Sequence, residues 1–565
     1  MRWAASFIVI FLCVISTPSI SWSDNFSDRQ LNSGIRNSDA YSYLLIEEAH
    51  KDRANAISLL KKAQEYSPDL PVVYFELSKA VFSLSGEGIL NSLDYIIQGI
   101  DAYSRNFWWS FTLTGSLVMS VIISFAAAFA LIVFVRLFAD ITLVAHDIEE
   151  SRSRGLSLGV IMVLSVASPL LFLGGMLLLL GLYMKKYDRF TVYLFLVVLV
   201  LYPIFLKMAT TYMKTSSSGV FKAIVKVKEG KDGDYAISAL KDSVDYVPLY
   251  SYALALKRKG RYDEAIAVYK KLLATRPDAG VYVNLGNCYV GLYNFDERQR
   301  SVLQHAVHAY TSAVNMKPMA SAYYNLSQVS REMLDFAGGE QYFKSALAVD
   351  RVAVSEYRTI AGRNVNRFVI DEPLPSSEIW NFVYKRFYIA SSGGLASFLS
   401  LVISLAAIIL IILFYLRDSI WHQHAVRCRK CGTILCSKCE KRLMWGEMCP
   451  QCFGSLVKLD ELDVKERVSW LLGIYEQQQK RRETMKALSF TLPGLSYVYA
   501  GRILPGFLML WPFLFFLVLV ITLMTLPDSA LTSHGFFKWA ALCCSALLYL
   551  AFYYITQKRI AKGWL

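Results

Sequence analysis

Long apolar runs are the feature that most constrains how this chain can fold. They lie near residues 107–136, 156–184, 190–212, 393–416, 490–525 and 536–556. A helix needs about 20 apolar residues to cross the hydrocarbon core of a bilayer, and these runs reach that length. Of the 565 residues, 55% are apolar and only 18% are charged. This balance is typical of an integral membrane protein with soluble parts. We therefore predict a mainly α-helical, polytopic membrane protein.

The first 23 residues have the pattern of an export signal. Arg2 supplies a positive start, Phe7 to Ile15 an apolar core, and Ser19 and Ser21 a small-residue cleavage pattern. An uncleaved signal anchor is the alternative, and in both cases the following residues start outside. The formal net charge of +14 gathers beside the apolar runs, which suits lipid headgroups. No recognition motif for nucleic acid accompanies it.

Between the runs, the middle stretch 213–390 contains a repeat. In its first unit the recurring small, aromatic and proline positions are Gly260, Tyr262, Ala265, Tyr269 and Pro277. Matching places hold Leu285, Gly286, Tyr289, Phe295, Ala306, Tyr310, Ala313 and Pro318, and then Leu326, Phe336, Phe343 and Ala346. This pattern resembles the tetratricopeptide repeat, a helix–turn–helix of about 34 residues. The resemblance implies an α-solenoid with a concave groove that takes a peptide or a partner helix.

The repeat pattern departs from that family in places. The second unit has roughly eight extra residues, about "ERQRSVLQ". The third has Gly339 at the small position and Arg351 in place of the closing proline. A weaker half-unit lies at 235–248, and the stretch 24–106 carries Ala56, Leu60, Ala63 and Pro68 in register. For 24–106, ordinary amphipathic helices remain an equal alternative. His305 and His308 lack a metal-spaced partner, and we expect them on a solvated face.

Three CxxC pairs within residues 428–452 carry the strongest chemical signal. A CxxC turn offers two thiolates to a metal, and zinc takes four such ligands in a tetrahedron. Cys428, Cys431, Cys449 and Cys452 have the spacing of two zinc-ribbon knuckles. The third pair, Cys436 and Cys439, needs two further ligands, for which His422 and His424 are the nearest candidates. We predict structural zinc, as one or two ions, in a module over 420–455.

The wording "RCRKCGTILCSKC…CPQCF" resembles the latter three ligand pairs of the FYVE zinc finger. That family interleaves its ligands, which implies one zinc on Cys428/Cys431 with Cys449/Cys452 and another on Cys436/Cys439. The first CxxC of the family is missing here, and its basic phosphoinositide motif survives only as "HAVRCRKC". Thiol–disulfide chemistry is the competing interpretation, but it needs a thioredoxin-like strand–helix context, and the flanks here are a membrane run and a charged helix.

Basic residues predict on which side of the membrane each part lies. Lysine and arginine gather at cytoplasmic helix ends, and they flank the cysteine module on both sides. The module and the basic tail 557–565 are therefore expected in the cytoplasm, where thiols stay reduced, and the repeats outside. That requires an even number of spans within 107–212. Run 156–184 holds Pro169 and Gly174–Gly175 and has basic flanks, so we expect it to be re-entrant. Three full spans with cytoplasmic repeats are the alternative.

The chain after the cysteine module completes the predicted organisation. Residues 456–487 should form an amphipathic helix lying along the membrane or against the zinc module. Residues 488–556 should form a transmembrane hairpin, with 393–416 as a separate span. The motif "PGLSYVYAGRILPG" resembles the opening of small bacterial double-span modules, with glycines for close backbone approach and Arg502 at the interface.

These patterns contain interaction-type modules and no catalytic constellation. We expect a non-enzymatic scaffold or adaptor in a bacterial inner membrane, whose repeats bind a protein partner. A component of a transport or export complex is the alternative, and it would need charged groups deep in the bundle. A redox enzyme is a third possibility.

Overall fold

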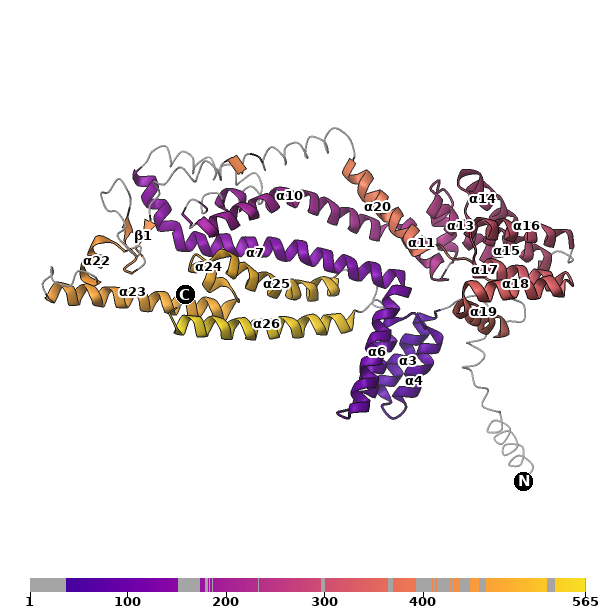
Figure 1. Ribbon diagram of the computed structural model, residues 1–565, viewed down its shortest axis with the longest axis horizontal. Helices are drawn as coiled ribbons and strands as arrows, with labels where there is room; N and C mark the ends of the chain where they lie inside the picture. Colours follow the sequence, from indigo (N-terminus) through magenta and orange to yellow (C-terminus); the bar gives the residue numbers. More distant parts are fainter. Residues whose placement is uncertain are drawn as a thin grey trace, which may run out of the picture. The chain divides into compact units, whose positions relative to one another are not determined.

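The structure is a computed structural model of the chain. It describes residues 37–563 apart from 151–172, 178–180, 182, 185, 232, 296–299, 364–368, 393–408, 410–411, 414–425, 429, 436–447, 457–463 and 526–533. Helices make up most of the described chain (Figure 1), as the sequence predicted. The chain divides into two compact units. The first comprises residues 1–110 and 213–386, and the second 111–212 and 387–565.

The first unit begins with two helical hairpins. They are formed by α3 (Asp39–Lys51), α4 (Ala56–Tyr66), α5 (Pro71–Val81) and α6 (Gly86–Arg105). Leu60 and Ala63, two of the register positions in the sequence, are buried in α4. Pro71 occupies the first turn of α5, where its fixed φ favours helix and no N–H is needed. The stretch thus consists of paired amphipathic helices.

The predicted repeats form consecutive helical hairpins in the same unit (Figure 1). They are α13 (Tyr246–Arg258) with α14 (Tyr262–Thr275), α15 (Ala279–Phe295) with α16 (Arg300–Met316), and α17 (Ala320–Glu332) with α18 (Phe336–Val349). A shorter hairpin, α11 (Gly219–Lys228) with α12 (Asp234–Leu240), precedes them, and α19 (Arg351–Arg363) and α20 (Ser376–Ser392) follow.

Small residues let these helices approach one another closely. A Cβ at Gly286 of α15 would lie 2.5 Å from the ring of the fully buried Tyr310 of α16. At Gly339 of α18, a Cβ would meet the Arg331 side chain of α17 at 2.8 Å. Glycine at the small position of the third repeat therefore reflects a tighter crossing than alanine would permit.

The second unit contains the long apolar helices and the cysteine module. Its elements are α7 (Phe107–Glu150, which begins in the first unit), α10 (Lys186–Ser217), β1 (Val426–Arg427), β2 (Ile434–Leu435), α22 (Pro450–Leu456), α23 (Val464–Thr491), α24 (Leu495–Tyr499), α25 (Ile503–Thr525) and α26 (Gly535–Ala561). Helices α7, α10 and α25 share one apolar core, which includes Phe129, Phe195 and Phe507. Figure 1 shows these three helices side by side.

Helices α7 and α10 run antiparallel. Phe111 stacks on Tyr212 with ring centroids 4.6 Å apart. Further along α7, Phe129 meets Phe195 at 4.7 Å, so rising numbers in α7 pair with falling numbers in α10. If each helix crosses a bilayer once, the segments before α7 and after α10 lie on the same side.

Four of the described helices are long and apolar enough to cross a membrane. These spans are Phe107–Leu143, Tyr187–Ser217, Ile503–Thr525 and Gly535–Ala561. They match the predicted runs at 107–136, 190–212, 490–525 and 536–556. The predicted runs 156–184 and 393–416 lie largely outside the described residues, as does the leader.

The helix in the predicted run 490–525 begins later than the composition suggested. α23 continues to Thr491, and the next long helix, α25, starts only at Ile503. Gly494 separates them with a φ of 89°, a conformation that glycine adopts without strain. A Cβ at Gly494 would lie 2.3 Å from the carbonyl oxygen of Gly506. The close backbone approach expected from this motif is confirmed, and Arg502 is exposed.

Candidate functional site

Four cysteines form a cluster in the second unit. The Sγ atoms of Cys428, Cys431, Cys449 and Cys452 all lie within 4.8 Å of one another. The Cys431 and Cys449 sulfurs are 3.6 Å apart. Tetrahedral zinc with sulfur at 2.3 Å needs sulfurs about 3.8 Å apart, so the arrangement fits such an ion. Three of the four residues are buried.

Two short elements position these thiols. β1 and β2 pair antiparallel, with Val426 opposite Leu435, and the first CxxC forms the turn between them. Gly432 closes that turn at a φ of 78°. The second CxxC leads into α22, where the Cys449 N–H donates to the Cys428 sulfur at 3.2 Å and the Cys452 N–H to the Cys449 sulfur at 3.3 Å.

Backbone donors favour the thiolate form that a metal requires. Burial raises the pKa of the Cys428 thiol, but hydrogen bonds from the backbone N–H groups of Cys431, Cys449 and Lys430 outweigh it and lower the pKa to about 7. Burial raises the pKa of the Cys452 thiol. A cation would lower it again, because positive charge stabilises thiolate. The four residues could therefore hold a soft metal ion.

The other predicted ligands lie outside the described residues. Cys436, Cys439, His422 and His424 all fall in segments that the structure does not describe. The prediction that these four residues bind a second metal ion is therefore not tested by the structure. His305 and His308, on α16 of the repeats, are both exposed, in agreement with a solvated face.

The cysteine module packs on two helices of its unit. Trp470 and Ile474 of α23 contact the buried cysteines. On another face of α23, Val468, Leu472 and Tyr475 are each more than half exposed. The module also meets α7, where Arg427 donates to the carbonyl oxygen of Ala139 at 3.2 Å. Helix α23 was expected to lie along the membrane or against the zinc module, and the structure shows its contact with the module.

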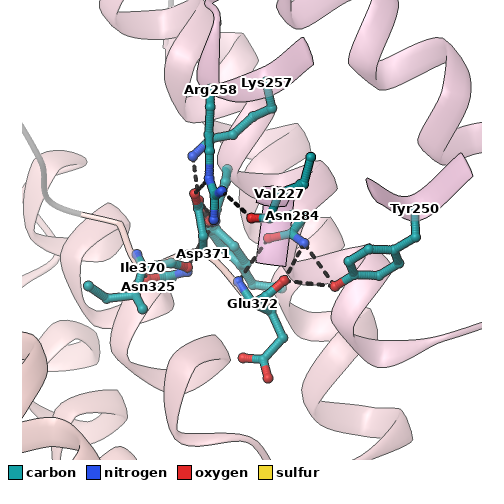
Figure 2. A network of polar contacts seen from close by, with 11 residues as sticks. Val227, Tyr250, Lys257, Arg258, Asn284, Asn325, Ile370, Asp371 and Glu372 are labelled. Carbon is teal, nitrogen blue, oxygen red and sulfur yellow. Dashed lines mark hydrogen bonds and ion pairs between the residues drawn. The ribbon is translucent and has the colours of Figure 1, made fainter. Parts of the chain in front are cut away.

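A second candidate site lies on the repeats, where residues 369–374, here called the strap, cross between α13, α15 and α17. Figure 2 shows the strap held by asparagine side chains. Asn325 accepts from the Ile370 N–H at 2.7 Å and donates to the Ile370 carbonyl at 2.8 Å. Asn284 does the same for Glu372, at 2.9 and 2.8 Å. These hydrogen bonds go to the backbone of the strap and do not depend on its side chains.

One strap side chain is recognised by charge. The Asp371 carboxylate is 9% exposed and pairs with the ammonium of Lys257 and, at 3.4 Å, with the guanidinium of Arg258. Asn287 donates to the same carboxylate at 3.0 Å. Buried carboxylates need such partners, because desolvation otherwise drives them to the neutral form. The site therefore selects for an acid at this position.

The apolar strap residues also have partners on the repeats. Val369 belongs to the core around Tyr310 and Leu326, and Ile370 to the core around Tyr324. Lys228 of α11 donates to the Leu374 carbonyl oxygen at 2.9 Å. The strap thus lies along the repeats as an extended peptide bound to several helices.

Sequence reasoning missed the asparagines of this site. A signal was present, because "VNLGN" and "YNLSQ" place Asn284 and Asn325 directly before matching leucines of successive repeats. The partner of these asparagines could not be inferred, since the strap lies 45 residues from Asn325 and 88 from Asn284.

Comparison with known proteins supports the repeat assignment. Residues 248–278 match the family described as tetratricopeptide repeat. This segment overlaps the first predicted unit, and it covers α14 and all of α13 except its first two residues. No curated protein matches the chain.

Proposed function

We propose that the protein is a non-enzymatic adaptor of a bacterial inner membrane. Its repeats bind a protein partner on the outer side, and its cysteine module holds structural zinc on the cytoplasmic side. The repeat match at 248–278 carries the first part, since tetratricopeptide repeats generally mediate protein–protein interaction. The cluster of four thiols carries the second.

Helix α7 has contacts within each of the two compact units. In the first unit, Phe107 lies 6.2 Å from Phe221 of α11 and 5.4 Å from Trp380 of α20, measured between ring centroids. In the second unit, Ala139 and Leu143 of the same helix contact the cysteine module at Arg427 and Ile434.

The pairing of α7 with α10 supports the same topology. If each helix crosses the bilayer once, the antiparallel packing is consistent with the residues before α7 and those after α10 on one side, as the adaptor requires. This is the arrangement that a re-entrant segment at 156–184 requires. Three full spans would instead make α7 and α10 parallel.

The export alternative depends on charged groups within the bundle. Arg136 and Asp140 of α7 are both buried. They pair with each other, and Arg136 also donates to the carbonyl oxygens of Val498 and Tyr499 at 3.2 and 3.1 Å. These charged groups therefore hold α24 against α7. A structural role of this kind favours the adaptor over an export component.

The FYVE resemblance suggests a role for the module at the inner leaflet, but the cluster itself accounts for structural zinc only. Its four sulfurs would close the coordination sphere of a bound zinc ion, whereas a catalytic zinc keeps a position open. We therefore propose that zinc stabilises the fold of the module, and that the surface of the module contacts a cytoplasmic protein or lipid.

Photo-crosslinking in intact cells tests the proposal. A photoreactive residue is placed at Lys270 or at Gln341, both exposed on the repeats, and separately at Ala127 in the apolar span of α7. The adaptor predicts a discrete protein adduct from Lys270 or Gln341 and none from Ala127. Adducts from Ala127 alone favour the export alternative. No protein adduct from either repeat position, in a chain present at normal level, contradicts the adaptor.

A further inference from the structure

The strap is bound as a peptide ligand would be. Two of its residues are each held at both backbone N–H and backbone C=O by an asparagine, Ile370 by Asn325 and Glu372 by Asn284. The hydroxyl of Tyr250 donates to the Glu372 carbonyl as well, at 2.8 Å. These backbone hydrogen bonds can form with any extended chain in the same register, so the acid at the Asp371 position supplies the selectivity.

The asparagine side chains that bind the strap are buried, and hydrogen bonds within the repeats also hold two of them in position. Asn284, Asn287 and Asn325 are each 0% exposed. The Tyr310 hydroxyl donates to Asn287 at 2.6 Å, and Asn325 donates to the same oxygen at 3.0 Å. These bonds join residues of α15, α16 and α17, so the receiving surface is held in place by the repeats themselves.

The strap is one continuous segment between two helices, and it contributes no turn of any helical hairpin. Its removal would leave the contacts between paired repeat helices, such as Gly286 with Tyr310, unbroken. It would expose the asparagine row and the cations Lys257 and Arg258 to solvent, where a second peptide could bind.

We propose that the strap is an internal ligand, and that the same surface binds an extended acidic peptide of a partner protein in its place. The peptide carries an apolar residue followed by an acid, corresponding to Ile370 and Asp371. This rests on the proposed adaptor function, and it identifies the chemistry of the partner: an extended segment with one carboxylate, read by Lys257, Arg258 and Asn287. In the structure, the strap closes that surface.

Peptide binding to the full-length protein in detergent tests this proposal. The probe is a fluorescein-labelled peptide of residues 369–376, "VIDEPLPS". The variant Asp371→Ala loosens the strap and leaves the surface intact. Because apparent affinity scales with the open fraction, the probe should bind Asp371→Ala at least about tenfold more tightly than the unaltered protein. Asp242→Ala, which removes an exposed acid elsewhere on the repeats, should bind like the unaltered protein.

Two further arms establish where the probe binds. Asn284→Ala added to Asp371→Ala should weaken binding at least about tenfold, because both hydrogen bonds to the backbone of the residue corresponding to Glu372 are lost. A probe with lysine at its third position should not bind, since it faces Lys257 and Arg258. Equal probe affinity in the Asp371→Ala and unaltered proteins, both folded, overturns the proposal. Equal binding of the lysine probe and the original probe to Asp371→Ala also overturns the proposal.

Hydrogen exchange keeps the proposal testable if Asp371→Ala does not fold. In the unaltered protein, the amides of Ile370 and Glu372 should exchange at least about tenfold faster than those of α15, because the strap opens by itself. Exchange of strap and α15 at one common rate overturns the proposal. Neither result bears on cross-linking from Lys270 or Gln341, so failure here is separable from failure of the adaptor function.

Discussion

The Tyr202 hydroxyl of α10 donates a hydrogen bond to the Ile122 carbonyl oxygen of α7 at 2.8 Å. This bond lies between the ring contacts of Phe111 with Tyr212 and Phe129 with Phe195, in antiparallel order. Helix α7 has 44 residues and so extends about 66 Å, roughly twice the hydrocarbon thickness of a bilayer. It can span the membrane and still reach partners beyond it.

Topology is the first prediction. A periplasm-active reporter enzyme fused after residue 350 should be active, and the same reporter after residue 455 or at the C-terminus should be inactive. The physical reason is the even number of crossings between α6 and α11 that the antiparallel pair provides. A cytoplasm-active reporter at the same positions is the control and should give the opposite pattern. Activity of one reporter at both 350 and 455 contradicts the two-sided arrangement.

Metal content is the second prediction. The purified protein should contain zinc, and Cys452→Ser should reduce the zinc bound by the described quartet at least about tenfold, because serine is a poor ligand for this ion. Cys543→Ser is the matched control, since Cys543 is an exposed thiol on α26 away from the cluster. Elemental analysis measures the metal. Unchanged zinc in Cys452→Ser would remove the quartet as a site.

Packing of the repeats gives the third prediction. Gly286→Ala should reduce the free energy of unfolding of the repeats by about 1–3 kcal/mol, because its methyl group overlaps the buried Tyr310 ring. Gly233→Ala is the control, since a Cβ there meets nothing within 4 Å and its φ is not positive. Denaturant unfolding monitored by hydrogen exchange on α15 compares the two. Equal stability of both variants would show that the α15–α16 crossing can relax.

The pH dependence of the repeats is the fourth prediction. Burial raises the pKa of the Glu372 carboxyl, and the hydrogen bond from Ser321 offsets only part of this. Between the unfolded and the folded pKa, the folded state binds more protons than the unfolded state. This residue's contribution to stability therefore falls as pH rises from the unfolded pKa through the folded pKa. Glu372→Gln keeps an acceptor for Ser321 and removes the charge. It should unfold at a higher temperature than the unaltered protein at pH 7, with the difference vanishing near about pH 4.

A control for that prediction is Glu264→Gln on α14. The Glu264 carboxyl is paired with Arg261, whose hydrogen bond lowers its pKa. Its charge is favourable in the folded state, so this change should not raise the unfolding temperature at pH 7. A higher unfolding temperature in both variants would indicate a general charge effect and would contradict the assignment to Glu372.

Local patterns in the sequence determined the elements of this protein. Apolar runs predicted the membrane-length helices, and recurring small and aromatic residues predicted the repeat hairpins, because burial of one helix face follows from residue periodicity. The spacing of the CxxC pairs predicted the quartet around Cys428, since a knuckle turn is set by neighbouring residues. Prediction failed at boundaries, as at Ile503, where a single Pro-Gly turn outweighed continuous apolar composition.

Only the tertiary structure decided which distant segments meet. Arg136 reaches the carbonyl of Val498 across 362 residues, and the strap lies on asparagines up to 88 residues away. Such bonds form between groups whose own segments are already complete as helices or extended chain. The packing of whole helices and strands determines which partners they meet, and local composition does not predict that packing. For the same reason the sequence could indicate a peptide-binding surface, while its occupation by residues 369–374 required the folded chain.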